Sequence, residues 1–395
     1  SPDDAQFSIA AGLEQFIEYV NNMRFTSEDI DYLRKKNLFN EGFLEYLKKF
    51  KFTGDIYAVK EGSVVFPNEP IVTVKAPVIE AQLIETMLLL TINHQSLIAT
   101  KANRIVRAAK DRTVLEFGAR RAQGYDAAIL GARAAYIGGV HGSATALSDI
   151  EFNVPASGTM AHSFIQLYND EYEAFSAYAK HNPDNTTLLV DTYNVLESGI
   201  PNAIRVAKEV LEPMGKRLKG VRLDSGDLTY LSNKSRKMLD EAGLEDCKIV
   251  ASNSLDEKII SELLNQKAPI DIFGVGERLI TSKSQPVFGG VYKLCAVEEN
   301  GELVPRIKIS ENVEKVTNPG YKTLYRFYDK DSKKAIGDVI ALHDEIINKD
   351  EYEIFDPIHT WKRKILKNFE VRKMQIPIFI KGECVYESPS IQEIR

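Results

Sequence analysis

The sequence predicts an α/β protein built around a β/α barrel, with a mixed α/β domain before the barrel and a β-rich extension after it. Two observations support this fold class. Short apolar runs recur in the middle of the chain, and polar residues or glycine follow each run at once. A stretch with helical spacing then separates each run from the next, which is typical of buried parallel strands joined by crossover helices.

Four apolar runs predict strands of the barrel. They span residues 187–190, 221–223, 248–251 and 270–273. The residues that follow these runs include Asp191, Asp224, Ser252, Asn253, Gly274 and Gly276. Functional groups of a β/α barrel gather at the carboxyl ends of its strands, so we expect these residues to share one site.

The flanking segments have other patterns. Residues 1–110 contain helical spacing, then β-branched runs between turns, then helical spacing again, which predicts a mixed α/β domain. Residues 111–290 hold the barrel. Residues 291–395 alternate short strands with charged turns, and we expect this extension to pack on the N-terminal domain.

The composition excludes several classes of protein. Hydrophobic residues make up 44% and charged residues 27% of the chain, as in ordinary globular proteins rather than disordered or fibrous ones. The net charge of -6 argues against a broad basic surface for nucleic acid or membranes, and no apolar run is long enough to span a bilayer. Three widely spaced cysteines match neither a disulfide framework nor a zinc site, which favours the reducing cytoplasm.

Two adjacent arginines follow the strand-like residues 113–115. Arg120 and Arg121 form a fork suited to phosphate or carboxylate groups, and Phe117 offers a ring face to a planar ligand. The alternative interpretation is an exposed helix start with one structural ion pair.

A threonine hydroxyl and a histidine imidazole lie where a predicted strand leads into a predicted helix. Thr159 and His162 are close enough in sequence to share a pocket, and histidine can shuttle protons or accept a phosphoryl group near neutral pH. A hydrogen-bonded core histidine is the alternative.

An arginine and several carboxylates surround the end of one predicted strand. Arg222 and Asp224 alternate along the strand, so their side chains lie on one face and suit an anion beside Mg²⁺. Asp191 and Asp227 are further candidates for Mg²⁺, which they would hold through water. The alternative is an Asp-Gly turn with an ion pair.

Glycines after the last predicted barrel strand are typical of a phosphate site. Gly274 and Gly276 free backbone N–H groups, and Thr281 follows them near a predicted helix start. Two glycines alone are a weak signal, but phosphate sites favour this position in barrels.

Taken together and in order, these motifs resemble nicotinate phosphoribosyltransferase. The motifs lie at residues 117–124, 136–139, 158–164, 189–193, 221–228 and 273–276. The resemblance implies the type II phosphoribosyltransferase fold, an irregular β/α barrel with a flanking domain that packs on it. It also implies a homodimer in which a second subunit completes each active site.

The resemblance further implies a reaction. Nicotinate and phosphoribosyl pyrophosphate would give nicotinate mononucleotide and pyrophosphate in NAD salvage, with ATP hydrolysis coupled through a phosphohistidine at His162. It assigns nicotinate contacts to Thr159 and Arg222, and phosphoribosyl contacts to the region of Gly274, Gly276 and Thr281. Residue chemistry adds Mg²⁺ at Asp191 or Asp224, where it would act with the two arginines on the pyrophosphate.

The turn at residues 142–145 favours nicotinate over nicotinamide as substrate. Nicotinamide-using relatives carry an acidic residue in this turn, whereas here it is uncharged and Arg222 would attract a carboxylate. Three alternatives stay open. They are a nicotinamide or quinolinate phosphoribosyltransferase, a phosphate-binding barrel lyase or aldolase, and a phosphoribosyl-binding barrel protein without catalysis.

The chain departs from the family in two places. An Asp-Leu-Tyr-x-Leu-Thr-like segment, whose tyrosine stacks on nicotinate in the family, does not precede Phe7, so we expect part of the site to be missing from this chain. Some archaeal relatives carry a four-cysteine zinc knuckle, where this chain has Cys384 alone. We therefore expect no structural zinc.

Overall fold

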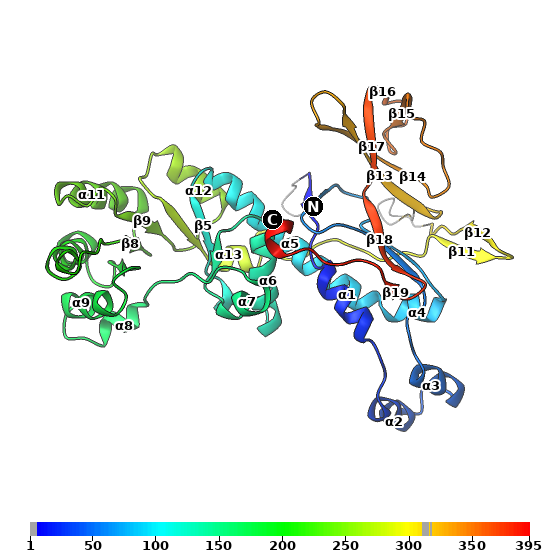
Figure 1. The fold of residues 1–395 in the computed structure, drawn as a ribbon, viewed down its shortest axis with the longest axis horizontal. Coiled ribbons are helices and arrows are strands. Elements are labelled where there is room, and N and C mark those ends of the chain that lie inside the picture. The colour runs from blue at the N-terminus through cyan, green and yellow to red at the C-terminus, as the bar shows by residue number, and fades with distance from the viewer. Residues whose placement is uncertain (1–5, 310–315, 317) are drawn as a thin grey trace. The chain divides into compact units, whose positions relative to one another are not determined.

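The computed structural model describes residues 6–309, 316 and 318–395, which form two compact units (Figure 1). Unit 1 consists of Gln6–Asn93 and Gly289–Pro389, and unit 2 consists of His94–Phe288 and Ser390–Arg395. The structure thus assigns residues 94–110 and 390–395 to the unit that contains the predicted barrel strands. In the part of the chain that is described, no helix has the length and apolar character needed to cross a membrane.

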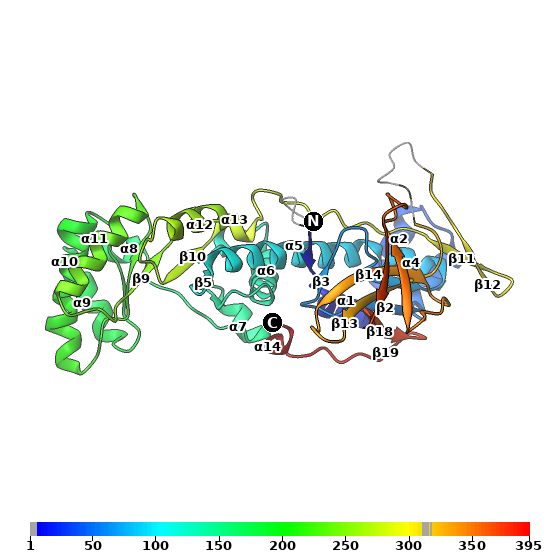
Figure 2. The same ribbon diagram turned by 90° about the horizontal axis from the view of Figure 1, so that it is seen from above.

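Unit 2 is built on a six-stranded sheet whose strand pairs are all parallel, in the order β6-β5-β10-β9-β8-β7. Figure 2 shows β5, β9 and β10 of this sheet. The strands are β5 (Thr113–Glu116), β6 (Gly142–Ser143), β7 (Thr187–Leu189), β8 (Gly220–Leu223), β9 (Lys248–Ala251) and β10 (Ile272–Val275). The last strand, β10, pairs with the first, β5, and a single parallel bridge from Ser143 to Ala156 continues the sheet beyond β6. The predicted α/β fold with an irregular barrel is therefore confirmed.

The strands form where the chain is apolar enough to be covered on both faces. Leu188, Val221, Ile249 and Phe273 are completely buried, as expected for parallel strands beneath helices. The helices of unit 2 are the C-terminal part of α5 (Glu85–Ala109), α6 (Tyr125–Ile137), α7 (Ala146–Phe152), α8 (His162–Gln166), α9 (Glu171–His181), α10 (Ile200–Val206), α11 (Leu228–Glu241), α12 (Glu257–Asn265), α13 (Glu277–Ile280) and α14 (Ile391–Ile394). Short helical turns occur at η2 (Ala119–Arg121), η3 (Val195–Gly199), η4 (Ala207–Leu211) and η5 (Glu212–Met214).

Unit 1 combines an N-terminal segment and a C-terminal segment of the described chain in one mixed domain. Its N-terminal elements are β1 (Ser8–Ile9), α1 (Leu13–Asn22), α2 (Ser27–Lys36), α3 (Glu41–Lys48), β2 (Asp55–Val59), β3 (Val64–Val65), β4 (Val72–Lys75) and α4 (Val78–Leu83). Its C-terminal elements are β11 (Ala296–Glu299), β12 (Glu302–Pro305), β13 (Lys322–Asp329), β14 (Ala335–Leu342), β15 (Glu351–Phe355), β16 (Arg363–Lys367), β17 (Phe369–Lys373), β18 (Gln375–Ile380) and β19 (Glu383–Cys384).

Strand pairing joins these two segments of unit 1. The sheet β19-β18-β2-β4 places β18 antiparallel to β2, and the rings of Phe52 and Phe379 meet edge to face with centroids 5.9 Å apart. A second sheet has the order β14-β13-β17. The C-terminal strands therefore complete the N-terminal domain.

Candidate active site

Side chains from several strand ends of unit 2 meet around one arginine. Arg222 of β8 donates from Nε to Ser252 Oγ at 2.9 Å and from Nη1 to Thr159 Oγ1 at 2.8 Å. Its Nη2 donates to Asp224 Oδ1 at 3.1 Å. Nη1 also lies 3.4 Å from the carbonyl oxygen of Met160, so one of the five guanidinium N–H groups is left for a ligand.

Asp224 is charged beside this guanidinium. Burial raises the pKa of its carboxyl, but hydrogen bonds from Ser252 and Arg222 and the charge of Arg222 outweigh that effect and hold the pKa below its usual value. The cluster therefore keeps a fixed carboxylate next to a fixed cation at neutral pH.

Asp191 lies two residues after the end of β7, and only one of its two carboxylate oxygens is hydrogen-bonded. Oδ2 accepts from the backbone N of Asp224 at 2.9 Å and from Ser225 Oγ at 2.5 Å. Oδ1 is buried and has no hydrogen-bond partner in the described part of the chain. The side chain is only 1% exposed, so an unpaired oxygen here is costly unless a cation approaches it.

Asp191 and Asp224 suit Mg²⁺ better than a metal that needs a full protein cage. Mg²⁺ is commonly held by one or two carboxylates, with waters and substrate phosphates as the other ligands. Within the described residues, no group of three or more His, Cys, Asp and Glu side chains is arranged to hold a metal. The unsatisfied Oδ1 of Asp191 fits a cation bound partly by the substrate.

His162 begins α8 and lies beside both carboxylates. Its Nε2 is 3.6 Å from Asp224 Oδ2 and 3.8 Å from Asp191 Oδ1, while Nδ1 shares a hydrogen bond of 3.1 Å with Thr192 Oγ1. The imidazole is 40% exposed, unlike a histidine buried in a core. It is therefore held in place and open to a reactant.

An aromatic ring lies next to the arginine. The guanidinium carbon of Arg222 is 5.8 Å from the centroid of Phe117. Two glycines, Gly274 in β10 and Gly276 just after it, allow this contact. A Cβ on Gly274 would lie 2.5 Å from the Phe117 ring, and one on Gly276 would lie 3.3 Å from the Phe117 carbonyl oxygen. Both glycines thus make room for the Phe117 segment, and their contacts to phosphate stay a prediction.

Within the described residues, Arg222 makes no hydrogen bond to the other predicted site residues, which are Arg120, Arg121, Asn253 and Thr281. Arg120 and Arg121 lie exposed in η2, with Arg121 Nε 3.7 Å from Glu277 Oε2. Thr281 donates its hydroxyl to the carbonyl oxygen of Glu277 at 2.7 Å. Asn253 follows β9 with a φ of 91°.

Asp227 has a structural role in the described chain. Its side chain caps the N-terminus of α11 by accepting from the backbone N of Tyr230 at 3.0 Å. Thr192 and Ser225, which orient His162 and Asp191, were missed by the sequence analysis. The signal for both was their position directly after Asp191 and Asp224.

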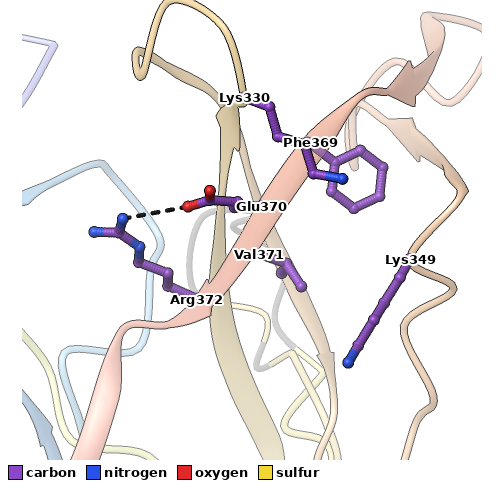
Figure 3. Close-up of a pocket in the computed structure, with 6 residues that line it drawn as sticks. All are labelled: Lys330, Lys349, Phe369, Glu370, Val371 and Arg372. Carbon is purple, nitrogen blue, oxygen red and sulfur yellow. Dashed lines mark hydrogen bonds and ion pairs between the residues drawn. The ribbon is translucent and has the colours of Figure 1, made fainter.

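A cavity of about 370 Å³ is found in unit 1 and holds none of the predicted site residues (Figure 3). Its lining consists of Lys330, Lys349, Phe369, Glu370, Val371 and Arg372. Arg372 is paired with Glu370 at 3.5 Å, which lowers the positive charge that the lining presents. The carboxylates, imidazole and guanidinium described above lie in unit 2, and we place the candidate active site there.

Comparison with known proteins places the chain in a family. Three family models of nicotinate phosphoribosyltransferase match it: the N-terminal domain at residues 1–93, the family itself at residues 113–344 and the C-terminal domain at residues 321–395. The chain belongs to the nicotinate phosphoribosyltransferase family. The predicted resemblance is therefore confirmed.

Relatives in this family are similar to this chain over about four fifths of their length. The nicotinate phosphoribosyltransferase of Bacillus subtilis is 50% identical over 397 residues, which cover 100% of this chain and 80% of that protein. One from Mycobacterium tuberculosis is 43% identical over 366 residues, covering 92% of this chain and 76% of the relative.

Solved structures agree with the fold of the nicotinate phosphoribosyltransferase family. The crystal structure of human nicotinic acid phosphoribosyltransferase has a TM-score of 0.86 at 27% identity, covering 100% of this chain and 85% of that one. A nicotinate-nucleotide pyrophosphorylase from Pyrococcus furiosus has a TM-score of 0.69 at 24% identity, covering 100% of this chain and 84% of that one, and supports the fold alone.

Proposed function

We propose that this chain joins nicotinate to phosphoribosyl pyrophosphate and releases pyrophosphate, with ATP hydrolysis coupled through His162. The observation that carries the proposal is the Arg222 cluster. A guanidinium with one free N–H group, fixed beside the Phe117 ring, suits a planar aromatic ring that bears a carboxylate. Family membership supports the same substrate, because its relatives are named for nicotinate.

The reaction needs charge stabilisation more than covalent chemistry from the protein. The pyridine nitrogen forms a bond to C1 of the ribose, and pyrophosphate leaves with the electrons of the C1–O bond. Positive charge develops on the sugar as the C1–O bond breaks, and the carboxylates of Asp191 and Asp224 would stabilise it electrostatically. Mg²⁺ held by these two residues would neutralise charge on the leaving pyrophosphate.

His162 is the candidate for transient phosphorylation. Its ring is partly exposed, and Thr192 fixes its orientation. The ring nitrogen would take the γ-phosphoryl group from ATP with release of ADP, and water would later remove it as phosphate. A phosphoryl group would bring about two negative charges close to Asp191 and Asp224, which gives ATP a means to alter the site. As the family resemblance implies, a second copy of the chain would complete each site.

The proposal is tested by pyrophosphate release from nicotinate and phosphoribosyl pyrophosphate with Mg²⁺, with and without ATP. We expect release that ATP stimulates and that loses its ATP dependence in His162→Ala. The matched control is His181→Ala, because His181 is an exposed histidine at the end of α9, and this variant should keep ATP stimulation.

Other outcomes separate the alternatives. ATP-independent release that His162→Ala leaves unchanged would keep the transferase and remove the phosphohistidine. Binding of phosphoribosyl pyrophosphate without release of pyrophosphate would favour a protein without catalysis. A higher kcat/KM for nicotinamide than for nicotinate would contradict the proposed substrate.

A further inference from the structure

We propose that Glu116 is a positioning residue for the nicotinate pocket, acting through Phe117 and through the turn at residues 142–145. This inference rests on the proposed function. Glu116 is the last residue of β5 and is completely buried. Its neighbour Phe117 lies just beyond the end of β5 and beside the Arg222 guanidinium.

Both carboxylate oxygens of Glu116 accept hydrogen bonds from segments at the site. Oε1 accepts from the backbone N of Gly118, and Oε2 accepts from Ser143 Oγ at 2.6 Å. Ser143 Oγ in turn accepts from the backbone N of Thr145 at 3.0 Å. Since a hydroxyl has one proton, that proton is donated to Glu116. The backbone N of Ala144 also donates to the Glu116 carbonyl oxygen at 2.9 Å.

Backbone hydrogen bonds at Phe117 and at the next residue, Gly118, fix the position of Phe117. Its own backbone N donates to the Val275 carbonyl oxygen at 2.8 Å, and the next N–H, that of Gly118, is held by Glu116. A Cβ on Gly118 would lie 2.7 Å from the carbonyl oxygen of Gly276, so this segment packs closely on β10. One carboxylate therefore sets the Phe117 segment relative to the β6 turn.

A completely buried carboxylate such as that of Glu116 is an unusual side chain for hydrogen bonds with a purely structural role. Burial raises the pKa of Glu116, although the hydrogen bonds from Ser143 and Gly118 oppose that effect. Two acceptor oxygens on one side chain are what the arrangement requires, because Gly118 and Ser143 both donate. An amide could accept from Gly118, but its NH₂ group cannot accept the proton that Ser143 Oγ donates, so this proton would lose its acceptor.

The test compares Glu116→Gln and Ser143→Ala with wild type in the pyrophosphate-release assay. Both variants break the same link, and we expect the KM for nicotinate to rise at least about fivefold while the KM for phosphoribosyl pyrophosphate stays within about twofold. The matched control is Ser148→Ala. Ser148 is a fully buried serine of α7 whose hydroxyl donates to the Ile129 carbonyl oxygen at 3.0 Å, and its loss should lower the melting temperature without moving either KM.

The outcomes separate this inference from the proposed function. Active wild type with unchanged KM values in both variants, and only a lower melting temperature as in the control, would overturn the positioning role. If Glu116→Gln does not fold, Ser143→Ala decides alone, because it removes a single hydroxyl. Wild type that releases no pyrophosphate would overturn the proposed function and this inference with it.

Discussion

At the scale of single residues, the candidate site depends on a position that lacks a side chain. Gly274 lies in β10 against the ring of Phe117, and a Cβ at this position would be 2.5 Å from that ring. The same ring lies beside the Arg222 guanidinium at 5.8 Å. A side chain at residue 274 must therefore move Phe117 away from its place in the site.

We expect Gly274→Ala to lower kcat/KM for nicotinate by about tenfold or more, because displacement of a substrate-positioning ring weakens alignment of the reactants. Steady-state kinetics on folded protein measures the effect. The control is Gly289→Ala, since no atom of the described residues other than its two chain neighbours lies within 4 Å of a Cβ built on Gly289. Wild-type kinetics in Gly274→Ala would show that the ring does not take part in binding.

Sequence reasoning identified part of this cluster for a definite physical reason. The pairing of Arg222 with Asp224 follows from alternation along one strand, which is local and can be derived from the sequence. The partnership of Glu116 with Ser143 depends on the pairing of β5 with β6, a long-range register that no local pattern encodes.

At the scale of secondary-structure elements, the start of α11 shows how one aspartate supports two interpretations. The sequence predicted Asp227 as a candidate for Mg²⁺, with an Asp-Gly turn and an ion pair as the alternative. In the structure its side chain accepts from the backbone N of Tyr230 at 3.0 Å, which satisfies a donor that the first turn of a helix leaves free.

We expect Asp227→Ala to lower the free energy of unfolding by about 1 kcal/mol, while Asp227→Asn keeps most of it because asparagine caps helices equally well. Urea denaturation measures both variants. Pyrophosphate release at several Mg²⁺ concentrations provides the second readout, and it should match wild type in both. A raised Mg²⁺ requirement in Asp227→Asn would instead support the metal-ligand interpretation.

The sequence predicted some strands of the barrel and missed another. The four apolar runs correspond to β7, β8, β9 and β10 with ends that differ by at most two residues, because strands covered on both faces leave a continuous apolar signal. In contrast, β6 consists of Gly142 and Ser143 alone and has no apolar run. It forms only because β5 offers it a parallel partner.

At the scale of the whole molecule, unit 1 contains an acidic pair that makes stability depend on pH. Arg326 donates from Nε and Nη2 to the two oxygens of Asp338 at 2.7 and 2.6 Å. The carboxyl group of Glu69 also forms a hydrogen bond with the side chain of Asp338. Burial, together with this hydrogen bond, raises the pKa of Glu69 to about 8.

The sign of the pH effect follows from the two states of Glu69. Unfolded, its pKa is about 4.3, so between that value and about 8 the folded protein holds a proton that the unfolded chain has lost. The free energy of unfolding therefore falls as pH rises through this window.

We expect Glu69→Gln to flatten this fall and to melt at a higher temperature than wild type above pH 8. Melting curves from about pH 5 to pH 9 measure it. Glu383→Gln makes the same charge change at an exposed residue of unit 1 and should leave the wild-type slope intact, whereas an equal response from both variants would show that Glu69 has no special role.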